Sequence, residues 1–269
     1  MAERYYASPQ PPSQLMCLIV IAWRSHHAYP LLIGANRDEF HARPALPAGF
    51  WRDAPQLCAG RDLQAGGSWL GITRGGRFAA LTNFRGPGVT ANDAPSRGEL
   101  VSAFLRGSDT PHGYLEQLQP QAMRFAGFSL LLGELGGELC YFCNRTGTIR
   151  RLEPGVYGLS NHLLDTPWPK VRDARAGLAA LVDAEPGIEA LFGLLADRSP
   201  PLPHELPDTG VGQQHEEILA PCFIVSEHYG TRASTVVRVA RDGWVDFEEH
   251  SFDAHGARQQ QVAHRFRIT

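Results

Sequence analysis

The stretch MCLIVIAW at residues 16–23, followed by LLIGA at residues 31–35, decides the fold of this chain. Both segments are continuous apolar runs rich in β-branched residues, and the turn-like SHHAYP separates them. Apolar runs this short are typical of buried strands. The sequence therefore predicts two buried strands, with the polar residues Asn36, Arg37, Asp38 and Glu39 at the end of the second strand.

The rest of the chain places groups of strands and groups of helices in turn. Gly-Gly turns predict two hairpins, within residues 68–83 and 125–143. Helical periodicity predicts helices at 97–106, 170–183 and 187–197, and β-branched runs predict strands at 222–227, 234–240 and 244–249, the first two joined by the turn EHYGTR. Residues 198–214 are rich in Pro and Gly and are expected to form a long loop. This order lacks regular β-α-β alternation, so the predicted fold class is α+β, with antiparallel sheets and helices packed outside them.

Composition excludes several classes of protein. The chain has 269 residues, 43% hydrophobic and 20% charged, which is ordinary for a globular protein. A net charge of -3 and a pI near 6.4 do not indicate binding to nucleic acid or anionic membranes. Lys170 is the only lysine among 25 basic residues, a bias typical of a GC-rich genome. No convincing linker divides the chain, so residues 16–269 are expected to form one domain.

The N-terminal residues, the hydropathy and the cysteines all indicate the same cellular compartment. Residues 1–15 contain no apolar segment of a signal peptide and are expected to be a disordered extension or a mis-assigned start. The sequence has no run of eighteen apolar residues, so no membrane-spanning helix is predicted. Five scattered cysteines favour free thiols in a reducing compartment over a disulfide framework. The expected location is therefore cytoplasmic.

Common chemistry-bearing motifs are absent from the sequence. There is no G-x-G-x-x-G, Walker loop, H-E-x-x-H or G-x-S-x-G. Cys140 and Cys143 have metal-site spacing, but they lie within a predicted strand, where residues three apart point to opposite faces. They are therefore interpreted as core cysteines, and no metal or cofactor is predicted. His26 and His27 are expected to be solvated in a turn.

Cys17 is the candidate for chemistry because Met16 precedes it. If translation starts at Met16, removal of that methionine leaves Cys17 with a free α-amine, whose pKa of about 7.7–8.0 suits a general base. The thiol, with an ordinary pKa of about 8.5, needs only modest help to become a nucleophilic thiolate. A chain that keeps residues 1–15 would instead hold this nitrogen as an amide. The alternative is that Cys17 is a small apolar residue of a strand.

Several motifs in order resemble the NRDE family, also called TANGO2-like. They are MCLI at 16–19, GANRDE at 34–39, GGSWLG at 66–71, LTNFR at 81–85, GLSNH at 158–162, DTPWPK at 165–170 and YGTRAST at 229–235. The resemblance runs from Met16 to about residue 250. That family is similar to N-terminal-nucleophile hydrolases, so the resemblance implies an αββα four-layer sandwich.

The resemblance also implies a set of site residues. The closest analogy is to bile-salt and penicillin-V amide hydrolases, and their order of catalytic residues matches Cys17, Arg37, Asp38, Asn83, Asn161 and Arg232 here. A guanidinium beside the thiol favours the thiolate, a carboxylate holds the α-amine, and Asn amides donate to the oxyanion. Arg37 and Asp38 are adjacent, whereas two residues separate the corresponding pair in those enzymes, so Asp38 and Glu39 both stay candidates for the carboxylate.

Two functional hypotheses stay open at this point. The first is hydrolysis of linear amides (non-peptide C–N bonds) by Cys17. The second is binding or trafficking of haem or a lipid-like small molecule, which the family's association with haem mobilisation and lipid homeostasis implies. His26, His27, His162 and Cys17 are the candidate haem ligands. The polar residues also have plainer interpretations, as a buried ion-pair network after the strand for Arg37 to Glu39 and as turn residues for Asn83 and Asn161.

Overall fold

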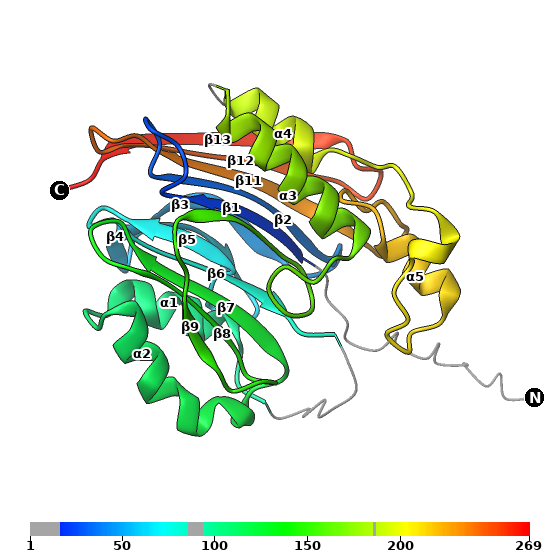
Figure 1. Cartoon of the computed structure of the whole chain (residues 1–269), viewed down its shortest axis with the longest axis horizontal. Coiled ribbons are helices and arrows are strands. Elements are labelled where there is room, and N and C mark those ends of the chain that lie inside the picture. Colours follow the sequence, from blue (N-terminus) through cyan, green and yellow to red (C-terminus); the bar gives the residue numbers. More distant parts are fainter. Residues whose placement is uncertain (1–16, 86–93, 185–186) are drawn as a thin grey trace, which may run out of the picture.

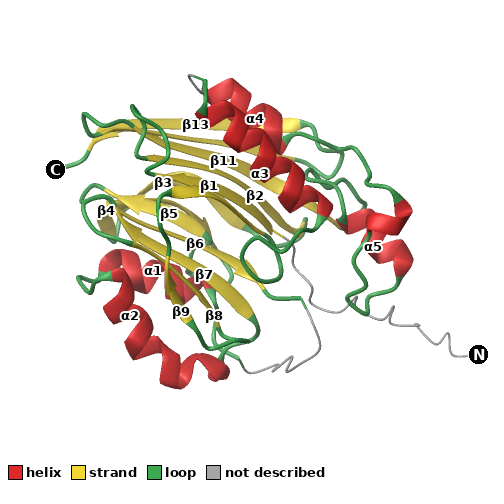
Figure 2. Ribbon diagram, in the orientation of Figure 1, coloured by secondary structure: helices red, strands yellow, loops and turns green. Residues whose placement is uncertain are grey.

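Two antiparallel sheets stack face to face between two layers of helices, as the computed structural model shows (Figure 1). The structure describes residues 17–85, 94–184 and 187–269, and the predicted extension at 1–15 lies outside them. Helices cover the outer face of each sheet (Figure 2). The predicted αββα sandwich of N-terminal-nucleophile hydrolase type is therefore confirmed.

The first sheet contains six strands. Their spatial order is β10 (Gly155–Leu159), β1 (Cys17–Trp23), β2 (Leu31–Phe40), β11 (Tyr229–Val239), β12 (Trp244–Phe252) and β13 (Arg258–Arg267). Helices α3 (Pro169–Val182) and α4 (Ile188–Leu195) pack on its outer face. The short helix α5 (Gln213–Leu219) follows a long loop that contains the 3₁₀ turn Pro203–Glu205.

The second sheet contains seven strands in sequence order. They are β3 (Ala45–Trp51), β4 (Ala54–Asp62), β5 (Leu70–Thr73), β6 (Arg77–Asn83), β7 (Phe128–Glu134), β8 (Leu139–Cys143) and β9 (Ile149–Arg151). Helices α1 (Gly98–Arg106) and α2 (Pro111–Leu118) cover its outer face, and the 3₁₀ helix Gln119–Arg124 follows α2.

Strand β1 explains why the decisive stretch is apolar without alternation. Ile19, Ile21 and Trp23 point into the core between the two sheets. Leu18 and Val20 point to the other face, into the core beneath α3 and α4. A strand that is covered on both faces needs apolar residues at every position. Strand β8 follows the same rule, because Cys140 belongs to the core under α1 and Cys143 to the core between the sheets. The prediction that these two cysteines point to opposite faces is confirmed.

The structure corrects the predicted end of the second strand. Strand β2 continues through the charged residues to Phe40, and all of Asn36 to Glu39 are buried. Their backbone groups are paired because the opposing strand β11 starts at Tyr229, which lies opposite Phe40. The predicted strand at 222–227 was wrong, since only Val225 forms a bridge, with Gly230. The predicted turn EHYGTR is present only in its first residues, because Tyr229–Arg232 form the first part of β11. Strand β13 was not predicted, since its alternate polar residues face solvent at the sheet edge.

Glu249 joins the two sheets through a buried carboxylate. It lies in β12, and its Oε1 accepts a hydrogen bond from the backbone N–H of Ala48 in β3 at 2.8 Å. Its Oε2 accepts a hydrogen bond from the Thr235 hydroxyl at 3.1 Å. Burial raises the pKa of Glu249 from 4.5 to about 7, although both hydrogen bonds oppose this shift.

Glu249→Gln should make the protein more stable at pH 8 and leave its stability at pH 5 nearly unchanged. Because folding raises the pKa of Glu249, its contribution is complete below about pH 4.5 and is lost as pH rises through about 7. The shift corresponds to about 3 kcal/mol of unfolding free energy, which a neutral Gln retains. Urea unfolding at both pH values measures the difference. Glu227→Gln is the control, since its side chain is 87% exposed, and it should differ from wild type by the same small amount at both pH values.

Candidate active site

The backbone of Cys17 is held at the first residue of β1 by two polar side chains. Its N–H donates a hydrogen bond to Asn161 Oδ1 at 3.1 Å, and its carbonyl accepts one from the Ser160 hydroxyl at 2.8 Å. Cys17 lies directly opposite Arg37 in the register of β1 and β2. Since Ile19 and Ile21 face the space between the sheets, the thiol of Cys17 faces the end of the same space.

Asn161 connects Cys17 to the second sheet. It follows β10, and its Nδ2 donates a hydrogen bond at 3.0 Å to the carbonyl of Asn83, the last residue of β6. The Arg85 N–H donates to the Asn161 carbonyl at 2.6 Å. Both Asn side chains are buried. Asn83 and Asn161 therefore lie at one end of the sandwich with Cys17, although 144 residues separate Cys17 from Asn161.

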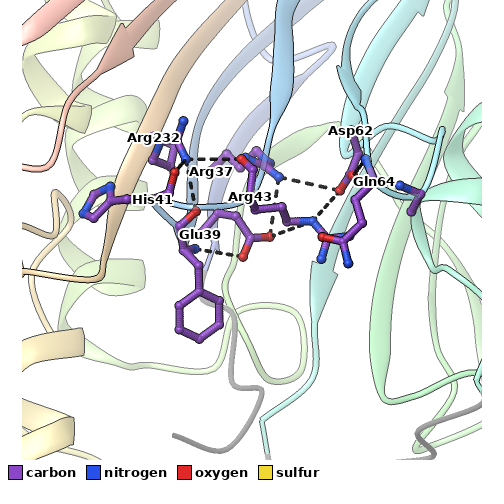
Figure 3. A network of polar contacts seen from close by, with 9 residues as sticks. Arg37, Glu39, His41, Arg43, Asp62, Gln64 and Arg232 are labelled. Carbon is purple, nitrogen blue, oxygen red and sulfur yellow. Dashed lines mark hydrogen bonds and ion pairs between the residues drawn. The ribbon is translucent and has the colours of Figure 1, made fainter. Parts of the chain in front are cut away.

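Arg37 belongs to an ion-pair network at this end (Figure 3). Its Nη2 lies 3.4 Å from Glu39 and 3.8 Å from Asp62, and its guanidinium lies 4.4 Å from the centre of the Trp69 ring. Arg43 completes the network by pairing with Asp62 at 2.6 Å and with Glu39 at 3.5 Å. The buried ion-pair network considered from the sequence is therefore present for Arg37 and Glu39, and it links β2 to β4.

Asp38 lies on the opposite face of β2, away from that network. Its Oδ1 accepts a hydrogen bond from the Thr231 hydroxyl at 2.6 Å. Its Oδ2 is buried and has no hydrogen-bond partner within the part of the chain that the structure describes. Burial raises the pKa of Asp38 to about 6, against the lowering effect of the positive charge of Lys170. Glu39 differs, because one of its oxygens faces Arg37 and Arg43 and the other accepts the Phe40 N–H.

Arg232 lies at an irregularity of β11 and is directed to the chain that leaves β2. The register between β11 and β2 shifts between Thr231 and Ala233, so Arg232 is the extra residue of a β-bulge. Its Nη1 donates to the carbonyls of Phe40 at 3.0 Å and His41 at 2.7 Å. Figure 3 shows Arg232 beside His41. Each described contact of Arg232 is with this backbone, and none is with Cys17.

The surroundings of Cys17 keep its thiol protonated in the full chain. Burial raises its pKa to about 12, and the negative charge of Asp38 adds to this effect. A hydrogen bond from the Asp38 backbone and the positive charge of Arg37 act in the opposite direction without overcoming it. At neutral pH this thiol is therefore a poor nucleophile unless another group takes its proton.

Two basic residues of the site were missed by the sequence analysis. Lys170 is buried at the start of α3, and burial lowers its pKa to about 8. Burial likewise lowers the pKa of Arg97 to about 10, and the charges of Cys17 and Glu39 act on it in the opposite direction. The signal for Lys170 was available, since it is the only lysine of the chain and ends the motif DTPWPK. No comparable signal marked Arg97.

The candidate haem ligands Cys17 and His26 do not lie together. Cys17 starts β1 and His26 follows its end, so the seven-residue strand separates them by about 20 Å. His26 was expected to be solvated but is buried, because its Nδ1 accepts the N–H of Ala28 and its Nε2 lies 3.2 Å from the Ala184 carbonyl. Within the described ranges, no cluster of three His, Cys, Asp or Glu side chains could hold a metal ion.

Comparison with known proteins gives the same family as the motifs. The family model described as Transport and Golgi organisation 2 matches residues 16–254, which include every candidate site residue. The chain belongs to this family. The Transport and Golgi organization protein 2 homolog of Bos taurus is 36% identical, over 94% of this chain and 99% of that protein. The homolog of Homo sapiens is 34% identical, over 88% of this chain and 93% of that protein.

A solved structure shares the fold of this Transport and Golgi organisation 2 family chain. Penicillin V acylase from Agrobacterium tumefaciens superposes with a TM-score of 0.50, over 94% of this chain and 86% of that chain. The two sequences are only 12% identical, so the similarity concerns the fold. As for membranes, none of the helices in the described residues has the length and hydropathy needed to span one.

Proposed function

We propose that this protein hydrolyses linear amides through a thioester on Cys17, once cleavage of the bond between Met16 and Cys17 frees the Cys17 α-amine. The observation that carries the proposal is the hydrogen bond of 3.1 Å between the Cys17 nitrogen and Asn161 Oδ1. A side-chain oxygen that accepts from this nitrogen leaves the nitrogen lone pair available when the group becomes a neutral amine. The amine is then oriented beside its own thiol, as a general base must be.

The proposed reaction assigns one role to each group. The α-amine takes the thiol proton, the thiolate attacks the amide carbonyl, and the proton passes to the leaving nitrogen as the C–N bond breaks. Water then hydrolyses the thioester. Asn83 donates to the developing oxyanion, Arg37 stabilises the thiolate, and Asp38 holds the α-ammonium form by charge. Arg232 acts at a distance in this scheme, since it fixes the backbone after β2 that carries Arg43.

The alternative is a binding protein for haem or a lipid-like small molecule. The observation in its favour is the pKa of about 12 for the Cys17 thiol, which makes the uncleaved chain unreactive. Cys17 and His162 stay candidates for ligand contact. The His162 ring is half-buried between the rings of Phe84 and Trp168, with centroid distances of 4.9 and 5.7 Å. Both proposals place the protein in the cytoplasm and give it a small-molecule partner, with no nucleic acid.

The hydrolase proposal is tested by trapping the acyl-enzyme. A chain that begins at Cys17 is incubated with a series of N-acyl p-nitroanilides of increasing acyl length, and intact mass is measured on acid quenching. We expect an acyl adduct on Cys17 together with release of p-nitroaniline. Cys17→Ser in the same chain should slow turnover, and Cys58→Ser should not, because Cys58 is fully buried in the core. If a chain with a verified Cys17 terminus shows no adduct and no turnover with any member of the series, the proposal is contradicted.

A further inference from the structure

We propose that Lys170 is a positioning residue of this site: its ammonium is the counter-ion that keeps Asp38 ionised, so that Asp38 can hold the α-amine of Cys17. The second half of this inference rests on the proposed hydrolase function. The first half concerns only two buried side chains and stands without it. None of the motif roles considered for the site includes a lysine.

The position of Lys170 is unfavourable for a lysine in two respects. Its side chain is only 6% exposed, and a buried ammonium is costly unless a counter-charge is near. It is also the second residue of α3, where the helix dipole disfavours a positive charge. Its Nζ donates a hydrogen bond to the Leu219 carbonyl at 3.0 Å, which satisfies one of three donors. A residue held against both effects is expected to have a specific partner.

The structure offers Asp38 as that partner. Helix α3 packs against β1 on the outer face of the first sheet, and Asp38 is on this same face of the neighbouring strand β2. The last residue of α5 and the segment after it contact both groups. The Leu219 carbonyl accepts a hydrogen bond from Lys170, and the Ile224 N–H donates to the Thr231 hydroxyl, which in turn donates to Asp38.

Asp38 in turn lacks what a buried carboxylate needs. It is 1% exposed, and its Oδ2 has no hydrogen-bond partner among residues 17–85, 94–184 and 187–269. A single hydroxyl cannot offset the burial of a full negative charge. A positive charge in the same closed space can, since electrostatic attraction is stronger where water is excluded.

The charges around the pair come from each element packed on it. Asp38 is surrounded by Lys170 from α3, by Arg37 and Glu39 from its own strand, and by the thiol of Cys17 from β1. Among the charges that lower the pKa of Asp38, that of Lys170 is the largest, and the largest opposing effect on the pKa of Lys170 comes from Asp38. Arg85 and Cys222 also act on Lys170, with smaller effects.

The choice of lysine is itself informative. Lys170 is the one lysine in a chain with 25 basic residues, so the other 24 are arginine. An ammonium is compact and fits a closed space, whereas a guanidinium is planar and needs several acceptors in its plane. Lys170 donates to one carbonyl, that of Leu219, and the Asp38 carboxylate acts on it by charge, an arrangement that suits an ammonium.

The test measures the ionisation of Asp38 directly. The side-chain carboxyl carbon of Asp38 is followed by ¹³C NMR against pH, and Asp38→Asn assigns its signal. Lys170→Gln is the principal variant, because it keeps a donor for the Leu219 carbonyl and removes the charge. We expect the apparent pKa of Asp38 to rise from about 6 by about one unit or more in Lys170→Gln, and by less in Lys170→Arg.

Arg85→Met is the matched control. It removes another buried cation near Lys170, one that pairs with Glu216 at 2.9 Å and is not among the charges acting most strongly on Asp38. The titration of Asp38 should be unchanged in Arg85→Met, even though breaking this buried pair destabilises the protein. Loss of packing alone would affect both variants alike, so only a charge effect separates them.

The second readout is the rate at which iodoacetamide alkylates Cys17 in the chain that begins there. The acidic limb of its pH–rate profile should be displaced in Lys170→Gln when the titration of Asp38 is displaced, because the charge of Asp38 acts on both the α-amine and the thiol of Cys17. An Asp38 titration equal to wild type in Lys170→Gln would overturn the inference. A shifted titration of Asp38 together with an unchanged acidic limb of Cys17 alkylation would overturn the positioning role. Wild-type Cys17 that reacts no faster than Cys58 would instead refute the proposed nucleophile.

Discussion

Removing residues 1–16 should raise the rate of Cys17 alkylation by iodoacetamide at pH 7.5 by about 100-fold. In the full chain the Cys17 nitrogen is an amide, and the thiol has a pKa of about 12, so the thiolate is very scarce. A free α-amine with a pKa of about 8 takes the thiol proton and brings the thiol close to its ordinary range. The thiolate fraction then rises by about 10³, and the lower nucleophilicity of a more acidic thiol offsets part of that gain.

The other four cysteines provide the control within the same molecule. Cys58, Cys140, Cys143 and Cys222 are all buried, so they should be labelled only in denaturant and at the same rate in both chains. The two chains are compared by mass spectrometry of each cysteine peptide after timed quenching. Equal rates at Cys17 in both would mean that the amine is not the base, and the binding-protein alternative would then become the better proposal.

Strand β2 explains why adjacent Arg and Asp residues can serve one site. Neighbouring residues of a strand point to opposite faces, so Arg37 faces the ion-pair network with Asp62, and Asp38 faces Thr231 and the layer of α3. Cys17 at the start of β1 lies at the edge between these faces, with its thiol on the side of Arg37. Of the two carboxylates left open by the sequence, Asp38 is the one with an unused oxygen, since Glu39 is occupied by the arginines.

The sequence predicted what depends on local pattern. The apolar run at 17–23 is buried on both faces, and this pattern needs no knowledge of distant residues. The hairpins at the Gly-Gly turns likewise follow from turn chemistry. The polar end of β2 could not be predicted in this way, because charged residues read as the end of a strand. They stay in the strand since Tyr229–Thr231, almost 200 positions later, pair with their backbone.

Long-range pairing also limits what could be inferred about the site. Motif order brought out Cys17, Arg37, Asp38, Asn83 and Asn161, but it could not say which groups share a face. The choice between Asp38 and Glu39 as the site carboxylate depended on that distinction. The partner of Asp38 was equally hidden, because Lys170 joins it only through the packing of α3 on the sheet. The sequence shows that Lys170 is the only lysine, but only the fold shows that it lies near Asp38.

Asn161→Leu, in the chain that begins at Cys17, should lower Cys17 alkylation at pH 7.5 by about 100-fold. The side chain of Asn161 contacts both halves of the site, since Oδ1 accepts from the Cys17 nitrogen at 3.1 Å and Nδ2 donates to the Asn83 carbonyl at 3.0 Å. Leucine has a similar volume and removes both contacts, so the amine loses the acceptor that orients it beside the thiol.

Asn161→Asp separates orientation from charge. The carboxylate keeps an acceptor for the Cys17 amine, but its negative charge stabilises the ammonium form and raises the pKa of that amine. We therefore expect alkylation to need a higher pH, with its midpoint displaced upward by about one unit or more, and to recover at alkaline pH. Asn161→Leu should stay slow at every pH, because no group orients the amine. Circular dichroism melting confirms that both variants are folded. The same pH midpoint in wild type and Asn161→Asp would show that Asn161 does not act on the amine, and the proposed general base would have to be another group.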